Sequence, residues 1–472
     1  MVFSSITFLA YFLPIFLLIY FIIDKKYKNY FILISSIIFY SWGAPKFIFV
    51  ILLTTFLDFH LVQWMDKLDK PLHRRLLLAL SVSINLGLLF YFKYCNFFIG
   101  NANKVLHVFG MENMPLLKVI MPIGISFYTF ETITYVVDVY RRVHKPLKNF
   151  WDYQLYIILF PKLIAGPIIR YHDLADQIHN RPDTVDDKLR GFYRFIIGLS
   201  KKVIIANYLG ESAQSIFNWD YNHLDATGAW MGALCYTFQI YFDFSGYSDM
   251  AIGIGRMMGF KFPENFHNPY TATSITDFWR RWHITLGSWM KNYLYIPLGG
   301  NRVKHKFLLY LNLWIVFLVS GFWHGAMWSF IFWGAYHGLF LVLERAFLLK
   351  VYKRIGRIPS IIITFIIVVI GWVPFKIESM SKSILYFKAM FSFKFTGMFH
   401  WDREFYFYLI LAFIFSFFTT FRWGQKIQDS IYINSYGTVK HIGATIITAA
   451  LFFICMSLIA ANGFNPFIYF RF

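Results

Sequence analysis

Two histidines stand in sequence contexts where an imidazole could move a proton. His324 comes near the end of an uncharged apolar stretch, SGFWHGAMW at 320–328, and His283 lies within ITDFWRRWHITL at 275–286. An ionisable side chain inside an apolar span is costly, which makes it a candidate functional group. A neutral imidazole can take a proton from a hydroxyl and return it, as acyl transfer requires. At His324 the pattern supports this interpretation and a hydrogen-bonded core histidine equally.

The residues around the second histidine have the spacing of an amphipathic helix over 278–293. At roughly 100° per residue, its tryptophans fall on one half, and Arg280, Arg281 and Lys291 fall on the other. The pattern predicts an interfacial helix on the cytoplasmic leaflet, with tryptophans toward lipid and arginines toward water. Thr276 is the expected N-cap, since its hydroxyl can accept a bond from a free amide. The histidine lies at the border of the two faces, where the pattern alone favours an interfacial side chain.

A third group of polar residues breaks an apolar segment at 237–260. Its members are Asp243, Ser245, Tyr247, Ser248 and Asp249, and four glycines allow close approach, namely Gly246, Gly253, Gly255 and Gly259. Buried acids need cationic partners, and Arg256, Arg280 and Arg281 are the candidates. A structural network is favoured here over catalysis.

The composition places the chain in a membrane. Of 472 residues, 58% are hydrophobic and 15% are charged, whereas soluble proteins carry nearer a quarter charged residues. Apolar runs of about 17–25 residues recur throughout, so we expect one membrane-embedded domain over 1–472. The candidate spans are 5–23, 30–42, 47–64, 76–92, 115–139, 229–248, 307–323, 329–349, 359–375, 405–421 and 443–461. Re-entrant or amphipathic helices are expected in the ambiguous segments 151–169 and 191–209.

The net charge of +20 is explained by cytoplasmic loops rather than by a nucleic-acid site. Lysines and arginines gather after the first, third and fifth spans and in 256–306 and 350–357. The positive-inside rule puts these loops in the cytoplasm, so the hairpin 307–349 turns on the outer side. The sequence has no nucleic-acid motif, and its three cysteines lack metal-like spacing. We therefore expect no nucleic-acid partner and no bound metal.

Short motifs follow one another along the whole chain. They are MVFSS with FLP at 1–14, PIGISFYTF at 122–130, DVYR at 138–141, FPKLIAGPIIRYHDL at 160–174, YFDFSGYSDMAIGIGRMMGF at 241–260, ITDFWRRWHITL at 275–286, YLYIPLGGNR at 293–302, SGFWHGA at 320–326 and NPFIYFRF at 465–472. In this order they resemble the membrane-bound O-acyltransferase family. The resemblance is strongest to the bacterial branch of alginate O-acetylase and the peptidoglycan and cellulose O-acetylation proteins.

The resemblance implies an all-α integral membrane protein with a ring of helices around a central tunnel. We expect about 11 transmembrane helices, with re-entrant and interfacial helices besides. The family's intramembrane histidine corresponds to His324 and its second histidine to His283, so both are expected to be catalytic. The chain departs from the family pattern at Lys291 and Asn292, where an Arg-Asp pair is expected. It also departs at Glu131, where an amide or a small residue is expected.

The expected function is O-acetyl transfer. An acetyl group would pass from a cytoplasmic thioester, acetyl-coenzyme A, across the bacterial cytoplasmic (inner) membrane to a polysaccharide of the alginate, peptidoglycan or cellulose type. Arg280, Arg281 and Lys291 would bind the donor's phosphates, although contacts with lipid headgroups explain them equally well. A supporting polar network or tunnel lining is expected from Asp243, Ser245, Tyr247 and Trp323. No bound cofactor is expected, and the partners would be lipid, donor, polysaccharide and a periplasmic acetyltransferase.

Two alternatives stay open. A transporter of a polysaccharide or lipid-linked precursor would explain the aromatic residues and basic loops, but the chain lacks the internal repeat that many transporters show. A D-alanyl transferase of the teichoic acid type lies within the same family. The ending at 465–472 and the motif at 275–286 resemble the acetylase branch more closely.

Overall fold

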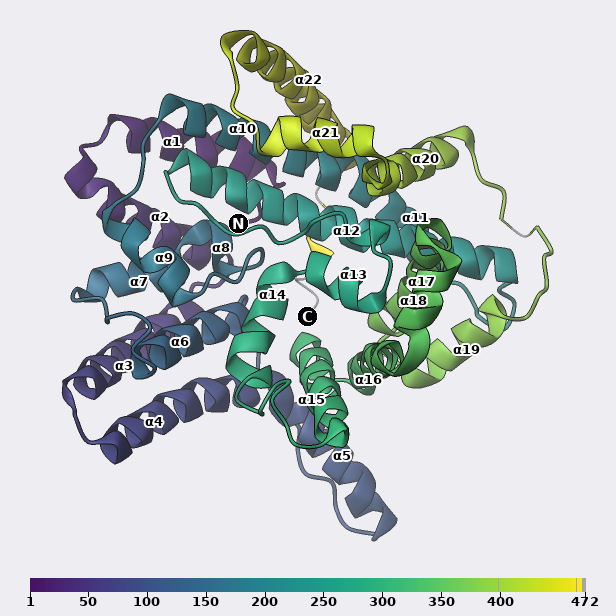
Figure 1. Ribbon diagram of the computed structural model, residues 1–472, viewed down its shortest axis with the longest axis horizontal. Helices are drawn as coiled ribbons and strands as arrows, with labels where there is room; N and C mark the ends of the chain where they lie inside the picture. The colour runs from purple at the N-terminus through teal and green to yellow at the C-terminus, as the bar shows by residue number, and fades with distance from the viewer. Residues whose placement is uncertain (398, 464, 469–472) are drawn as a thin grey trace. The chain divides into compact units, whose positions relative to one another are not determined.

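The computed structural model describes residues 1–397, 399–463 and 465–468. Within these residues the chain is helical, with no strand and one isolated antiparallel bridge between Phe266 and Trp282, which confirms the all-α prediction. The chain groups into two compact units, and Figure 1 labels the helices in chain order. The first unit holds residues 1–188 and 254–263, and the second holds residues 189–253 and the chain from 264 onward. The single domain over 1–472 stays a prediction.

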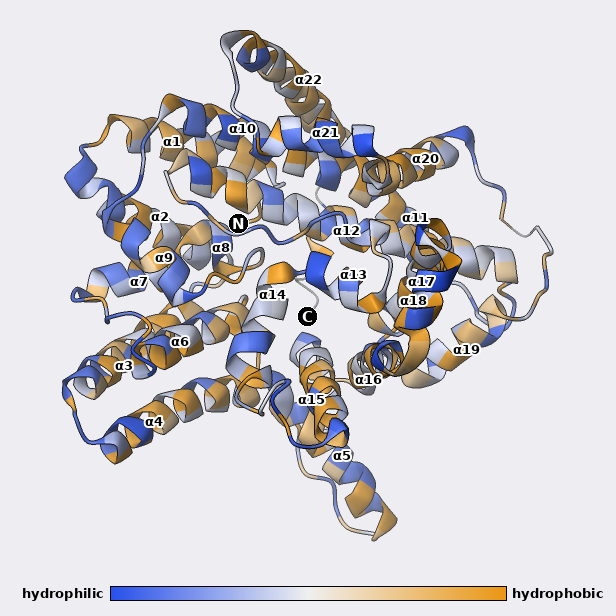
Figure 2. Ribbon diagram, viewed as in Figure 1, coloured by the Kyte–Doolittle hydropathy of each residue, from blue (hydrophilic) through white to orange (hydrophobic). Residues whose placement is uncertain are grey.

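The first unit contains the N-terminal helices. They are α1 (Leu13–Ile22), α2 (Lys28–Gly43), α3 (Phe47–Lys67), α4 (Pro71–Leu89), α5 (Cys95–Val108), α6 (Ile125–Tyr140), α7 (Phe150–Ile158), α8 (Phe160–Leu163) and α9 (Tyr171–His179). Helices α3, α4 and α6 pack against one another. In Figure 2, long apolar stretches run along α3 and α4, while the short loop between them is hydrophilic.

The second unit contains the helices that carry the candidate site. Helix α10 (Val185–Ser200) begins in the first unit and continues into the second. The others are α11 (Asn207–Phe217), α12 (Ala226–Met257), α13 (Ile275–Arg281), α14 (Ile284–Trp289), α15 (Lys306–His324), α16 (Trp328–Leu343), α17 (Leu349–Ile355), α18 (Arg357–Lys376), α19 (Met380–Met390), α20 (Arg403–Phe417), α21 (Arg422–Tyr432) and α22 (Thr438–Asn462). The last turn of α12 belongs to the first unit.

Seven helices among the described residues are long and apolar enough to cross a bilayer. They are Phe47–Lys67, Pro71–Val108, Lys306–His324, Trp328–Ile355, Arg357–Lys376, Arg403–Thr420 and Thr438–Ala461, and Thr7–Ile22 is a shorter apolar helix. These seven agree with seven of the expected spans. The total of about 11 stays a prediction. The span expected at 229–248 lies within α12, whose central polar residues interrupt its apolar character.

Two expected segments differ from a simple helix. The span predicted at 115–139 is wrong in its first part, because residues 111–122 are not helical and α6 begins only at Ile125. Pro115 and Pro122 lack the amide hydrogen that a helix needs, which explains the difference. The segment 151–169 is broken as expected, with α7 ending at Ile158 and α8 ending at Leu163.

Helices α10 and α12 touch along a seam of glycines within the second unit. A Cβ atom on Gly198 would lie 2.5 Å from the carbonyl oxygen of Gly246, and one on Gly246 would lie 2.7 Å from that of Gly198. Further along the same two helices, a Cβ on Gly253 would lie 2.6 Å from the carbonyl oxygen of Gly191. Glycine is required because backbone meets backbone here. The close approach expected of Gly246 and Gly253 is confirmed.

The variant Gly246→Ala is expected to lower the midpoint of thermal unfolding in detergent by about 1–3 °C. The added methyl group must push two helix backbones apart, and overpacking of this kind costs about 1–3 kcal/mol. Gly443→Ala on α22 is the matched control, because a Cβ there meets no atom within 4 Å. Equal midpoints for the two variants would contradict the seam.

Candidate active site

The short helices α13 and α14 of the second unit follow each other with a break between them (Figure 1). His283 stands at this break. Its backbone is left-handed, with φ 45° and ψ 53°, so α13 ends before it and α14 begins after it. The single amphipathic helix predicted over 278–293 is therefore wrong. Periodicity could not reveal the break, because the left-handed residue changes the direction of the chain without changing its hydrophobic pattern.

The helix before this break is capped differently from the prediction. Ser274 is the N-cap of α13, and its hydroxyl accepts a hydrogen bond of 3.0 Å from the backbone amide of Asp277. The cap predicted at Thr276 is wrong, since its hydroxyl donates to the Glu344 carboxylate at 2.6 Å. Glu344 also accepts from the amides of Ile275 and Thr276, so it holds the start of α13 against the end of α16.

The aromatic face of the 278–293 stretch is buried against protein. Trp282 contacts the rings of Phe266 and Trp372, with centroids 5.0 and 4.9 Å apart, and only 2% of its surface is exposed. Trp279 packs against Trp333 with centroids 5.4 Å apart. The predicted orientation of these tryptophans toward lipid is therefore wrong. These aromatic side chains instead pack against other rings of the second unit.

His283 is itself 2% exposed, so it is a buried group and not an interfacial one. Its ring meets Phe244 edge-on, with centroids 4.7 Å apart, and its Nδ1 lies 3.1 Å from the Asn265 amide oxygen. Burial lowers the pKa of His283 to about 3. The ring is therefore neutral at physiological pH, and a neutral ring has one nitrogen that can accept a proton.

His324 is the last residue of α15 and is 5% exposed. Its ring lies among three aromatic rings, at centroid distances of 4.9 Å to Trp323, 5.3 Å to Trp333 and 5.2 Å to Phe375. The indole of Trp323 also faces His283, with centroids 6.3 Å apart. One tryptophan ring thus lies against both histidines. The structure brings together the two residues that the motifs single out, although His324 ends α15 and His283 lies at the break between α13 and α14.

The polar residues of α12 lie near the same place. The Asp243 carboxylate forms an ion pair of 2.7 Å with Lys202 and accepts a bond of 2.7 Å from the backbone amide of Ile468. Tyr247 stacks on Phe467 with centroids 4.7 Å apart. Phe467 also lies 5.9 Å from Phe244, the ring that touches His283. The α12 side chains therefore hold residues 467–468 beside the candidate site, and Ser245 is buried on the same helix.

The acids of α12 do not pair with the arginines expected from the sequence. Asp249 pairs with Lys201 at 2.6 Å and with Arg194 at 2.8 Å, and Asp243 pairs with Lys202. The expected partners Arg256 and Arg281 are instead paired with Asp187 and Asp277. The cationic residues nearest in the fold come from α10 and the turn after it, which no local pattern near 237–260 could indicate.

The residues expected to bind the donor are placed differently from one another. Arg280 and Lys291 have exposed side chains. Arg281 is half-buried, with its Nε donating to Asp277 at 2.8 Å and its Nη1 to the Thr271 hydroxyl at 3.4 Å. Arg281 thus contacts protein side chains, whereas Arg280 and Lys291 are exposed. The role of all three residues in donor binding stays a prediction.

Comparison with known proteins decides the family. The profile of the membrane-bound O-acyltransferase family matches residues 34–373, well over half of the chain. The chain is also 41% identical to a probable alginate O-acetylase of Pseudomonas putida, and the match covers 100% of both chains. The chain belongs to the membrane-bound O-acyltransferase family. It is therefore an acyltransferase, which confirms the expected class of enzyme.

Other relatives locate this O-acyltransferase within its family. It is 45% identical to a probable alginate O-acetylase of Pseudomonas aeruginosa, over 83% of this chain and 75% of the relative. It is 36% identical to a peptidoglycan O-acetyltransferase of Helicobacter pylori, over 86% of this chain and 82% of the relative. A teichoic acid D-alanyltransferase of Bacillus subtilis is only 27% identical, over 53% of this chain and 67% of the relative. The resemblance to the acetylase branch is confirmed.

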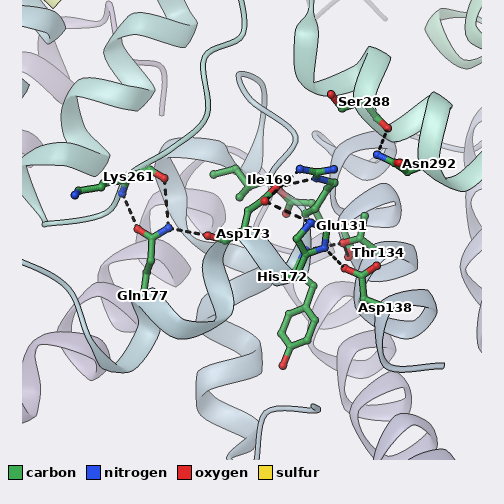
Figure 3. A network of polar contacts seen from close by, with 12 residues as sticks. Glu131, Thr134, Asp138, Ile169, His172, Asp173, Gln177, Lys261, Ser288 and Asn292 are labelled. Atoms are coloured by element: carbon green, nitrogen blue, oxygen red, sulfur yellow. Dashed lines mark hydrogen bonds and ion pairs between the residues drawn. The ribbon is translucent and has the colours of Figure 1, made fainter. Parts of the chain in front are cut away.

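The two departures from the family pattern have local explanations in this O-acyltransferase. Glu131 on α6 forms an ion pair with Lys162 on α8, and both side chains are buried, so the additional acid is compensated within the first unit. Asn292 donates from its side chain to the backbone oxygen of Ser288 at 2.9 Å, which is a bond within its own helical turn (Figure 3). Its neighbour Lys291 is exposed.

A second polar network lies in the first unit. His172 sits between two carboxylates, with Nδ1 2.7 Å from Asp138 and Nε2 3.4 Å from Asp173 (Figure 3). Gln177, one turn after Asp173, accepts a bond of 2.7 Å from the backbone amide of Lys261. These bonds join α6, α9 and the 254–263 segment, so the network is explained as a structural connection.

Sequence reasoning missed two contributors to the site. Lys202 lies in the ambiguous segment 191–209, and its pairing with Asp243 depends on the crossing of helices that are distant in the sequence. Asn265 lies in the PENFHNPY stretch, where a single amide has no periodicity or charge to mark it. Its hydrogen bond to His283 is visible only in the fold.

Proposed function

We propose that this O-acyltransferase moves an acetyl group from a thioester donor to a hydroxyl of an envelope or extracellular polysaccharide. The observation that carries the proposal is the pair of buried imidazoles, His283 and His324, against the same indole of Trp323. The names of the relatives, alginate O-acetylase and peptidoglycan O-acetyltransferase, support an acetyl group and a polysaccharide.

In the proposed reaction, His324 is the general base. Its neutral ring takes the proton of the acceptor hydroxyl while the hydroxyl oxygen attacks the thioester carbonyl. A new C–O bond forms, the C–S bond breaks, and the protonated ring returns its proton to the departing thiolate. The thioester end of the donor meets the site near His283 from the cytoplasmic side, and His283 serves the transfer step and not the affinity for the donor. The aromatic rings around His324 exclude water, which would otherwise hydrolyse the thioester.

The donor in this proposal is acetyl-coenzyme A, which reaches the site from the cytoplasm. Arg280 and Lys291 are exposed, and the positive-inside rule puts them on that side of a bacterial cytoplasmic membrane. Cations of this kind suit the phosphates of coenzyme A. Transfer to the polysaccharide would take place on the outer side, and a periplasmic acetyltransferase is the proposed partner for that step.

The test of the donor is a binding isotherm for acetyl-coenzyme A with the purified protein in detergent. Replacing Arg280 and Lys291 together with glutamine is expected to raise the dissociation constant about 10- to 30-fold, at about 1 kcal/mol for each exposed charge contact. Added salt should weaken binding by the wild type more than by this variant. Lys353→Gln, an exposed lysine on α17, is the matched control.

Two further results test the role of His283 and distinguish acetyl-coenzyme A from a carrier protein as the donor. His283→Ala is expected to lose acetyl transfer while it keeps most of its affinity for coenzyme A. If the wild type shows no affinity for acetyl-coenzyme A but accepts an acyl group from a carrier protein, the donor assignment is wrong. The function of a D-alanyl transferase would then be the better interpretation.

A further inference from the structure

The backbone on both sides of His283 is bound to a second stretch of chain, residues 265–267. Phe266 and Trp282 form an antiparallel bridge. The amide of His267 donates to the Arg281 carbonyl at 2.9 Å, and the amide of Ile284 donates to the Asn265 carbonyl at 3.0 Å. The left-handed residue is therefore flanked by backbone hydrogen bonds at Arg281, two residues before it, and at Ile284, directly after it.

The side chain of Asn265 is 1% exposed and lies among polar atoms of three residues. Its Oδ1 is 3.1 Å from Nδ1 of His283, 2.9 Å from the Thr285 hydroxyl and 3.4 Å from the Thr285 amide nitrogen. Its Nδ2 donates to the Ser248 hydroxyl on α12 at 3.1 Å. A backbone amide can only donate, so the atom that faces Thr285 must be the oxygen of the Asn265 amide.

This orientation decides where the imidazole carries its hydrogen. An amide oxygen can only accept, so the nitrogen of His283 that faces it must be the protonated one. In a neutral imidazole with a hydrogen on Nδ1, the lone pair is on Nε2. We propose that Asn265 is a positioning residue that fixes the tautomer and ring orientation of His283, so that Nε2 acts toward the substrate.

The proposal rests on the function proposed for His283, and it adds the atom through which that residue acts. Asn265 itself does not touch the reacting groups. Its bond to Ser248 ties the amide to α12, the helix that also presents Phe244 to the histidine ring. The described neighbours Phe244, Trp323 and Asn265, which come from α12, α15 and the 265–267 stretch, are uncharged. Because these three neighbours carry no charge, none of them can form an ion pair with His283 that would oppose the ring orientation set by the Asn265 amide.

The first test reads the tautomer directly. In solid-state nitrogen-15 spectra of histidine-labelled protein, the neutral ring of His283 is expected to show a protonated Nδ1 and an unprotonated Nε2, assigned by the signals that His283→Ala removes. In Asn265→Leu the Nδ1–H loses its acceptor, so these signals should shift or split. A wild-type ring protonated on Nε2 would overturn the proposal.

The second test uses kinetics. Asn265→Leu is expected to lower kcat for acetyl transfer about 10- to 1000-fold with little change in KM for the donor, because the wrong tautomer presents an N–H in place of a lone pair. Asn265→Asp keeps the acceptor, so it should restore much of kcat. Its carboxylate should also raise the proton affinity of His283 and move the acidic limb of the pH–rate profile to higher pH.

The control lies in the same stretch of chain. Asn268 also has a left-handed backbone, but its side-chain amide bonds to Gln428, so Asn268→Gly should keep normal kcat and the normal spectrum. Unchanged kcat and spectrum in Asn265→Leu would sink the positioning role. Normal acetyl transfer by His283→Ala would instead sink the proposed function, and the spectrum of the wild type would still report the tautomer.

Discussion

His324→Ala is expected to lower acetyl transfer by about 10²–10⁴-fold, the usual contribution of a general base, while the protein stays folded. The residue ends α15, so a smaller side chain there does not interrupt a helix. The neighbouring rings of Trp333 on α16 and Phe375 on α18 pack against each other and against Trp372. Loss of the imidazole therefore removes the proton acceptor and leaves most of the packing in place.

The measurement is acetylation of the polymer in cells together with transfer by purified protein. The thermal midpoint and the elution volume in detergent report folding. His305→Ala is the matched control, because His305 is exposed and makes no cap bond at the start of the same helix. Normal acetylation with His324→Ala would remove this residue from the mechanism. If His324→Ala also fails to fold, the test is repeated with His324→Gln, whose side chain keeps the volume but cannot act as a base.

Lys202→Met is expected to destabilise the protein by about 3–5 kcal/mol. Asp243 would lose its cationic partner while it stays buried, and removal of one partner from a buried ion pair is costly for this reason. The double variant with Asp243→Asn should recover much of the loss, because it removes the unpaired charge. The asparagine oxygen can still accept from the amide of Ile468.

The stability of these variants is best compared by chemical or thermal unfolding in one detergent. Lys382→Met on α19 is the control for loss of an exposed lysine. If Lys202→Met is as stable as this control, the ion pair contributes little. If the double variant is less stable than Lys202→Met alone, repulsion by an unpaired Asp243 is not the cause of the loss.

The sequence predicted the parts of this protein that depend on composition and on ordered motifs. Apolar runs located the long helices, since length and hydrophobicity are local properties of the chain. The two histidines were identified by a family resemblance, while the pattern around His283 alone favoured an interfacial side chain. The predictions that failed concern features that depend on contacts between distant segments. These features are the break at His283, the packing of Trp282, and the pairing of Asp243 with Lys202.

The same limit applies to Asn265. A hydrogen bond from a loop amide to a histidine 18 residues later leaves no period in the sequence. The cap at Ser274 shows the same kind of error on a smaller scale. Both Ser274 and Thr276 have a suitable hydroxyl, and only the position of Glu344 explains why Thr276 is used elsewhere.

The glycine seam between α10 and α12 has a consequence for how this protein can change over time. A methyl group on Gly246 would collide with the main-chain oxygen of Gly198, and every residue type has that oxygen. No substitution at the facing position can make room, so the damage cannot be repaired from the opposite helix. Positions 198 and 246 should therefore show no pairwise covariation among homologues. Their invariance would reflect backbone geometry and carry no information about the chemistry.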